Sequence, residues 1–141
     1  MSEASVFRVS WREDGSCTAL ARVTARDATG AATGIDGEGK WVKQADISTI
    51  TCSVFDKSSS TPSTAIATPT VTVASSIIDS PVTDGVIWPV DSTGYNFLHD
   101  LSYTNFPTGG HVYRVEYTFT PTGGAKWSLV FEGIATSIMT S

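Results

Sequence analysis

The sequence predicts an all-β domain, on the evidence of its composition and of its short alternating segments. The 141 residues include 20 Thr, 18 Ser, 13 Val and 9 Ile, against 4 Leu. β-Branched side chains lose rotamer freedom in helices and fit the pleated surface of a sheet. A chain of this length is expected to form one domain, residues 1–141, with a single hydrophobic core.

The N-terminal segment is predicted to form an arm or edge strand over residues 1–12, in which polar residues alternate with Phe7, Val9 and Trp11. Residues 16–25 alternate in the same way and predict the next strand. A side-chain period of two places alternate residues on opposite faces of a sheet. One face of each strand is therefore expected to be buried.

The middle of the chain alternates between loops and strands. Residues 27–40 contain four glycines and predict a long loop, and residues 44–47 predict a single turn. That turn leads into a strand ending at Phe55, and the Ser-rich residues 57–64 predict an exposed link. Residues 70–73 predict a further strand.

The segment that follows is less regular. Residues 75–79 favour no element, and residues 85–90 predict a short strand that Pro89 confines to a sheet edge or a strand end. Residues 95–101 are compatible with a helical turn or with an extended crossover, and residues 106–110 predict a turn.

The clearest pattern is a hairpin near the end of the chain. Residues 111–120 alternate strictly, residues 121–124 predict the turn, and residues 125–136 form the return strand. This hairpin is expected to be the centre of the core. Tyr113 is either a corner tyrosine, as in many sandwich domains, or an ordinary core residue.

The spacing of these strands fits a sandwich or a barrel, which periodicity alone does not separate. The short length and the long crossovers favour an immunoglobulin-like antiparallel β-sandwich of about seven or eight strands.

The charge pattern argues against several partners. The net charge is −5, only 16% of residues are charged, and no basic run offers a footprint for phosphates, so no nucleic acid is expected. No apolar stretch reaches the roughly 20 residues that a membrane span needs, so no membrane is expected. The first residues lack a basic region followed by an apolar one, so we expect synthesis in a cytoplasm without a signal peptide.

No catalytic pattern is apparent, and the sequence predicts no enzyme, no metal and no cofactor. The two histidines, His99 and His111, lack a G-x-S-x-G serine or any other nucleophile at a known spacing. No EF-hand pattern or phosphate-binding glycine loop occurs. The two cysteines, Cys17 and Cys52, fall on strands and favour free buried thiols, with a cross-sheet disulfide as the open alternative.

The four tryptophans permit two interpretations. Trp127 belongs to the core by alternation. Trp41 follows the Gly-rich loop and Trp88 lies on a predicted edge strand, so both are candidates for exposure. Exposed rings suit either a protein interface or a platform for sugars. An interface or core role is favoured over a carbohydrate-binding module.

Three segments together resemble a known class of protein: 47–56, 85–91 and 109–119. Their layout resembles small immunoglobulin-like structural proteins of tailed bacteriophages and is similar to the N-terminal domain of phage upper baseplate proteins. The match covers roughly residues 16–136. The chain departs from the pattern by the loop at 27–40 and by the crossover at 91–107.

The resemblance implies a non-enzymatic virion component made in the cytoplasm of a bacterial host. The leading hypothesis is a capsid decoration or cement protein, and the alternative is a neck, tail or baseplate adaptor. Its expected partners are the major capsid protein, or tail and baseplate proteins, and copies of itself in a homo-oligomeric assembly. The predicted interface residues are Phe7, Val9, Trp11, Trp41, Trp88, Ile134 and Ile138.

Overall fold

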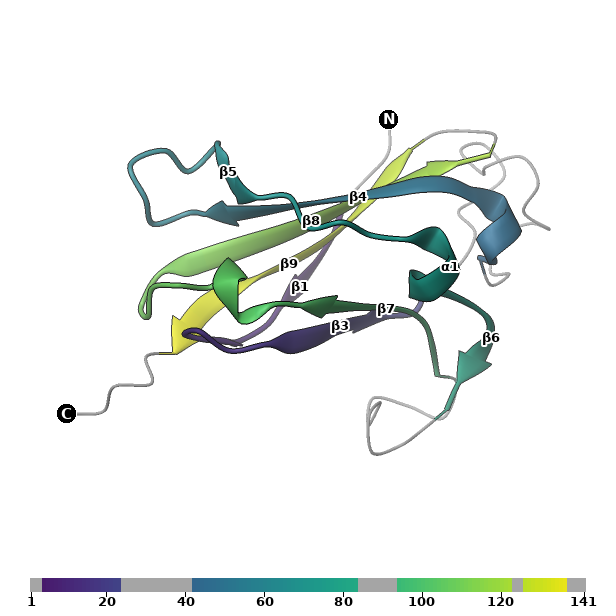
Figure 1. The fold of residues 1–141 in the computed structure, drawn as a ribbon, viewed down its shortest axis with the longest axis horizontal. Helices are drawn as coiled ribbons and strands as arrows, with labels where there is room; N and C mark the ends of the chain where they lie inside the picture. The colour runs from purple at the N-terminus through teal and green to yellow at the C-terminus, as the bar shows by residue number, and fades with distance from the viewer. Residues whose placement is uncertain (1–3, 24–41, 84–93, 123–125, 137–141) are drawn as a thin grey trace.

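The computed structural model describes residues 4–23, 42–83, 94–122 and 126–136. Within these ranges, nine strands form a six-stranded and a three-stranded sheet (Figure 1). The strands are β1 (Ala4–Arg8), β2 (Trp11–Arg12), β3 (Cys17–Ala21), β4 (Ile47–Asp56), β5 (Ala65–Ala67), β6 (Ile77–Val82), β7 (Tyr95–Leu101), β8 (Val112–Pro121) and β9 (Trp127–Thr136). The short helices are η1 (Gln44–Asp46), α1 (Val73–Ser76) and η2 (Tyr103–Asn105).

The larger sheet has the order β1-β9-β8-β4-β5, and β2 also pairs with β9. The smaller sheet has the order β3-β7-β6. The prediction of a mostly-β fold is confirmed, but the larger sheet is mixed rather than purely antiparallel. Both β1 and β2 run parallel to β9, because strands from opposite ends of the chain are not joined by a hairpin that would force them antiparallel.

The core lies between the two sheets and centres on the predicted hairpin. The ring of Phe97, on β7, meets Tyr117 and Phe119 of β8 edge-on, with ring centroids 5.0 and 5.5 Å apart. Trp127, on β9, stacks on Phe119 at 5.3 Å. These contacts join the sheets through interlocking aromatic rings, which pack favourably in edge-on and stacked arrangements.

Several sequence predictions match the described elements. The turn expected at 44–47 is η1, and the strand expected to follow it is β4. The expected strand at 16–25 is the shorter β3, which buries Ala19 and Ala21. The segment 95–101 is extended and forms β7, the central strand of the smaller sheet.

The prediction of a strand at residues 70–73 was wrong. The chain crosses here from β5 in the larger sheet to β6 in the smaller one, and α1 begins at Val73 (Figure 1). Val71 and Val73 pack against the core without joining a ladder. Their β propensity is overridden because, among the described residues, no strand lies beside the crossing segment to pair with it.

A fully buried asparagine ties two remote parts of the backbone together. Asn96 accepts a hydrogen bond from the Val23 N–H at 2.6 Å, and its amide donates to the carbonyl oxygens of Val23 and Val42 at 2.9 Å each. The Val42 N–H also donates to the Val23 carbonyl at 3.1 Å. β7 thereby holds the end of β3 against the chain that leads into β4.

Of the two roles left open for Tyr113, its hydrogen bonds match the corner tyrosine. Tyr113 is fully buried, and its hydroxyl accepts a hydrogen bond from the Thr108 N–H at 2.8 Å and lies 3.3 Å from the Thr108 carbonyl oxygen. A tyrosine bonded to backbone a few residues upstream fixes the corner where a strand begins. The loop at 27–40, the strand at 85–90 and the turn at 123–124 lie outside the described residues.

Candidate functional site

The structure distributes the predicted interface residues between surface and core. Phe7, on β1, is 46% exposed, and Ile134, on β9, is 55% exposed. Val9 is partly buried against the core. The remaining residues Trp41, Trp88 and Ile138 lie outside the described residues, so their assignment stays a prediction.

Trp11 lies in the core of its own chain rather than on the surface. Its ring is 7% exposed and stacks on Phe106 at 4.5 Å, and its Nε1 donates a hydrogen bond to the Tyr113 carbonyl at 3.2 Å. Alternation grouped it with Phe7, but it faces the interior where β2 passes over η2 and β8. These contacts within the chain account for the burial of Trp11, and no binding partner is needed to cover its ring.

The edge formed by β1 and β9 carries a row of alternating charges. Arg114, Glu132 and Arg8 are aligned across β8, β9 and β1. Glu132 accepts from Arg8 at 2.6 Å and from Arg114 at 3.3 Å. Desolvation by itself would raise the pKa of Glu132, but the hydrogen bonds from the two arginines outweigh that effect and lower the pKa. Arg114 also bonds Glu116 at 2.6 Å, so the outer face holds two cations and two anions in one network.

A groove of about 430 Å³ opens between the β1 edge and the β3 edge. It is lined by Phe7, Arg8, Val9, Leu20, Ala21, Arg22 and Phe131. Phe7 stacks on Phe131 with ring centroids 5.6 Å apart. Apart from Phe7 and Val9, these residues were not singled out from the sequence. No local signal marks them, because the groove brings β1 and β3 together with β9 from the other end of the chain.

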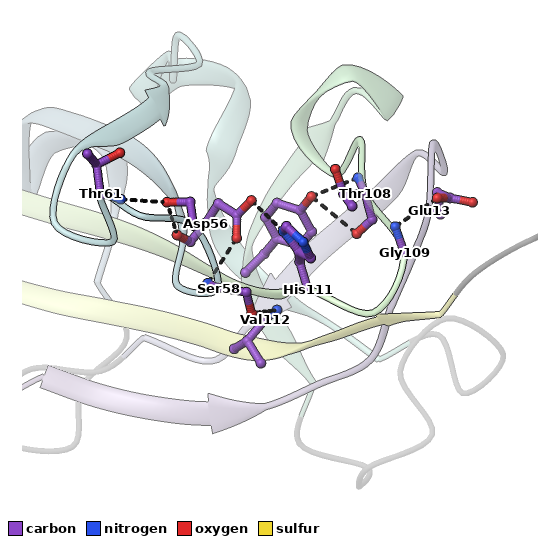
Figure 2. Close-up of polar contacts among 10 residues, drawn as sticks. Glu13, Asp56, Ser58, Thr61, Thr108, Gly109, His111 and Val112 are labelled. Carbon is purple, nitrogen blue, oxygen red and sulfur yellow. Dashed lines mark hydrogen bonds and ion pairs between the residues drawn. The ribbon is translucent and has the colours of Figure 1, made fainter.

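Turns gather at one end of the sandwich, on the left in Figure 1, around a histidine–aspartate pair. His111 Nδ1 lies 2.7 Å from Oδ2 of Asp56, and the two side chains point toward one another in Figure 2. Asp56 Oδ1 accepts from the Ser58 N–H at 3.0 Å. Glu13 accepts from the Gly109 N–H at 2.7 Å and joins the N-terminal turn to the same cluster.

Most of these polar contacts hold backbone groups of the turns. The Ser58 hydroxyl accepts from the Val112 N–H at 2.9 Å, and the Ser59 hydroxyl donates to the Asp56 carbonyl at 2.9 Å. A nucleophilic serine instead needs its hydroxyl directed at the histidine. Within the described part of the chain, no three His, Cys, Asp or Glu side chains gather as metal ligands. The cluster thus braces the turns around the Tyr113 corner.

The other histidine belongs to a polar chain inside the sandwich. His99 Nε2 lies 3.1 Å from the Thr70 carbonyl, which can only accept, so Nε2 carries the proton. Nδ1 then accepts from the Tyr117 hydroxyl at 2.8 Å. Burial lowers the pKa of His99, and the bond to Thr70 and the charge of Asp100 partly offset that effect. Through these two contacts His99 links the crossing segment, β7 and β8.

Both cysteines are free thiols, Cys52 buried and Cys17 half-buried. Burial is the main cause that raises the pKa of Cys17 to about 11 and of Cys52 to about 12. Thiols with such pKa values are protonated at neutral pH and are poor nucleophiles. Neither has the low pKa that a reactive cysteine requires.

None of the helices in the described part of the chain has the length and hydropathy needed to cross a bilayer. Comparison with known proteins gives no match to a family model, to a curated protein or to a solved structure.

Proposed function

We propose that this chain is a non-enzymatic structural protein of a tailed-bacteriophage particle, a decoration or cement protein with an immunoglobulin-like fold that docks on the capsid through its β1/β9 edge. The observation that carries the proposal is that Phe7 on β1 and Ile134 on the neighbouring β9 are both exposed, on opposite faces of the sheet. Large apolar residues exposed beside an open sheet edge favour attachment to another protein.

The sequence resemblance supports the same assignment. Two of the segments that carry it, 47–56 and 109–119, include β4 and β8, which are neighbouring antiparallel strands with Cys52 aligned to Tyr117. The corner geometry of Tyr113 is typical of sandwich domains. The resemblance thus draws on residues that act together in the fold.

The outer face of the larger sheet supports dense packing of many copies. Its two arginines and two glutamates are paired with one another. A surface whose charges are compensated locally repels neighbouring copies only weakly at physiological ionic strength. A braced sandwich also presents its edge in one geometry, which lowers the entropy cost of docking.

The test is the copy number of the chain in purified particles of the phage or prophage that encodes it, measured by quantitative mass spectrometry against the major capsid protein. A decoration protein is expected at hundreds of copies. A number in the range of a few to a few dozen favours the alternative, a neck, tail or baseplate adaptor. Complete absence from particles refutes the virion assignment.

A second measurement tests the docking edge. Particles lacking the protein are mixed with purified protein and sedimented, and the bound fraction is measured. Phe7→Ser should reduce binding, whereas Tyr103→Ser should not. Tyr103 is a suitable control because it is 57% exposed but lies in η2, at the turn cluster. Equal loss in both variants would contradict docking through β1.

A further inference from the structure

In the described part of the chain, one side of strand β1 faces no other strand. Among the described residues it is the last strand of the six-stranded sheet. The Val9 N–H donates to the Glu132 carbonyl at 3.0 Å. In this segment the N–H and C=O groups of odd-numbered residues therefore point toward β9. Since peptide groups alternate in direction along a strand, those of Ala4, Val6 and Arg8 point away from β9. This is the arrangement to which an extended chain adds as a further strand.

The row of charges ends at this edge with a cation. Across β8, β9 and β1 the aligned residues are Arg114, Glu132 and Arg8. The Arg8 side chain is 77% exposed, against 19% for Glu132, and Arg8 contacts the carboxylate through Nη1. A guanidinium has five N–H donors and suits bidentate pairing with a second carboxylate. The residue that continues the alternation on an added strand is therefore an aspartate or a glutamate.

The opposite side of the same edge is largely apolar, although Arg22 also lines it. On a strand added to β1, the residues before and after the carboxylate point to the other face. There they meet the groove between β1 and β3, which is lined by Phe7, Leu20, Ala21 and Phe131. Phe7, which is 46% exposed, would be covered by such residues. The added strand therefore needs an apolar residue on each side of its carboxylate.

We propose that β1 binds an extended segment of a partner protein in which one acidic residue, placed opposite Arg8, is flanked on both sides by apolar residues. The inference rests on the proposed docking function and names the chemistry of the partner at that edge.

A second copy of β1 does not meet this requirement. The sequence of β1 is Ala-Ser-Val-Phe-Arg, without an acidic residue. Within the bounds Ala4–Arg8, no register of two paired β1 strands places a carboxylate opposite Arg8. Glu3, which precedes β1, lies outside the described residues. The charge at the edge thus selects a different sequence as the occupant.

The first experiment uses a fluorescein-labelled probe peptide, Ser-Thr-Val-Glu-Val-Thr-Ser, and two matched peptides in which glutamine or lysine replaces the glutamate. Binding to the full chain is measured by fluorescence anisotropy at low salt. The glutamate peptide should bind up to about fivefold more tightly than the glutamine peptide, which is the largest ratio that one exposed ion pair commonly supplies. The lysine peptide should bind at least about tenfold more weakly than the glutamate peptide because it faces a like charge.

Two protein variants separate the edge from general charge effects. Arg8→Gln should remove the preference for glutamate over glutamine. Arg12→Gln should retain it, since Arg12 is an exposed arginine of β2 that lies outside the groove. An unchanged preference in Arg8→Gln, or equal affinity of all three peptides for the wild-type chain, overturns the proposal.

Amide hydrogen exchange by NMR gives a readout that does not depend on a variant. Adding the glutamate peptide should slow exchange at the outward amides of Val6 and Arg8 and leave Phe7 unchanged. Protection of Val6 and Arg8 that appears with rising protein concentration alone, together with a dimer in sedimentation, would show a second copy on this edge and refute the partner.

Peptide binding by a chain absent from particles would refute the virion assignment alone. Presence in particles without any peptide preference would refute this inference alone.

Discussion

The Asn96 side chain is the contact whose removal should most damage the sandwich without touching its aromatic core. It is fully buried and makes three hydrogen bonds, one from the Val23 N–H and two to the carbonyls of Val23 and Val42. In Asn96→Ala, the Val23 carbonyl keeps its bond from the Val42 N–H. The Val23 N–H and the Val42 carbonyl lose the partner that Asn96 supplied.

The size of the effect follows from these two groups. A buried donor or acceptor left without a partner costs about 1–3 kcal/mol. Two such groups, together with the lost packing of the side chain, give a loss of about 3–5 kcal/mol in the free energy of unfolding. With an m-value of about 2 kcal/mol per molar urea, the midpoint of unfolding should fall by about 2 M.

The assay is equilibrium urea unfolding followed by tryptophan fluorescence and circular dichroism, with Asn96→Asp as a matched variant. Aspartate keeps an acceptor for the Val23 N–H but directs a carboxylate at two carbonyl oxygens. It should be at least as destabilising as alanine at pH 7 and should recover part of the loss at low pH, where the protonated carboxyl can donate once. A loss below about 1 kcal/mol in Asn96→Ala would refute the reasoning, because it would place the cost of both orphaned groups below the usual range.

Three further predictions concern the edge, the corner and the thiols. Gly133→Ala should destabilise the domain by about 2–4 kcal/mol in thermal unfolding, since the new Cβ would lie 1.6 Å from the Val9 carbonyl oxygen and force the N-terminal strands off β9. An unchanged midpoint would contradict that close approach. Tyr113→Phe should cost about 1–2 kcal/mol in urea unfolding, because it removes the hydroxyl that anchors the corner; equal stability would assign the residue a packing role alone. In the native protein at pH 8, reaction with iodoacetamide should be slower than in urea by about 100-fold for Cys17 and about 1,000-fold for Cys52, since pKa values of about 11 and about 12 leave few thiolates. Rapid native alkylation of either thiol would refute the burial argument.

The alternation of side chains was enough to predict the strands that carry the core. Val115, Tyr117 and Phe119 alternate with polar residues and are fully buried on β8, and Trp127 and Leu129 are buried on β9. A period of two is a local property of the backbone, so it is visible in the sequence. The predicted hairpin and its place in the core followed from that property.

Local patterns failed where the partner strand decided the structure. The segment around Val71 and Val73 has the composition of a strand but crosses between sheets and ends in α1. The stretch at β7 carried no clear alternation, yet it became the central strand of the smaller sheet because β3 and β6 pair on either side of it. Strand propensity expresses a fit to neighbours, and the neighbours of these segments are distant in the sequence.

The sequence by itself determined the class of fold, the alternating strands and the weakly charged composition. Only the tertiary structure decided that Trp11 is a core residue, that β1 runs parallel to β9, and that Arg8 ends a row of charges beside an apolar groove. Each of these features joins residues more than a hundred positions apart, or strands of different sheets. Their geometry depends on how the sheets pack, which no local spacing of side chains specifies.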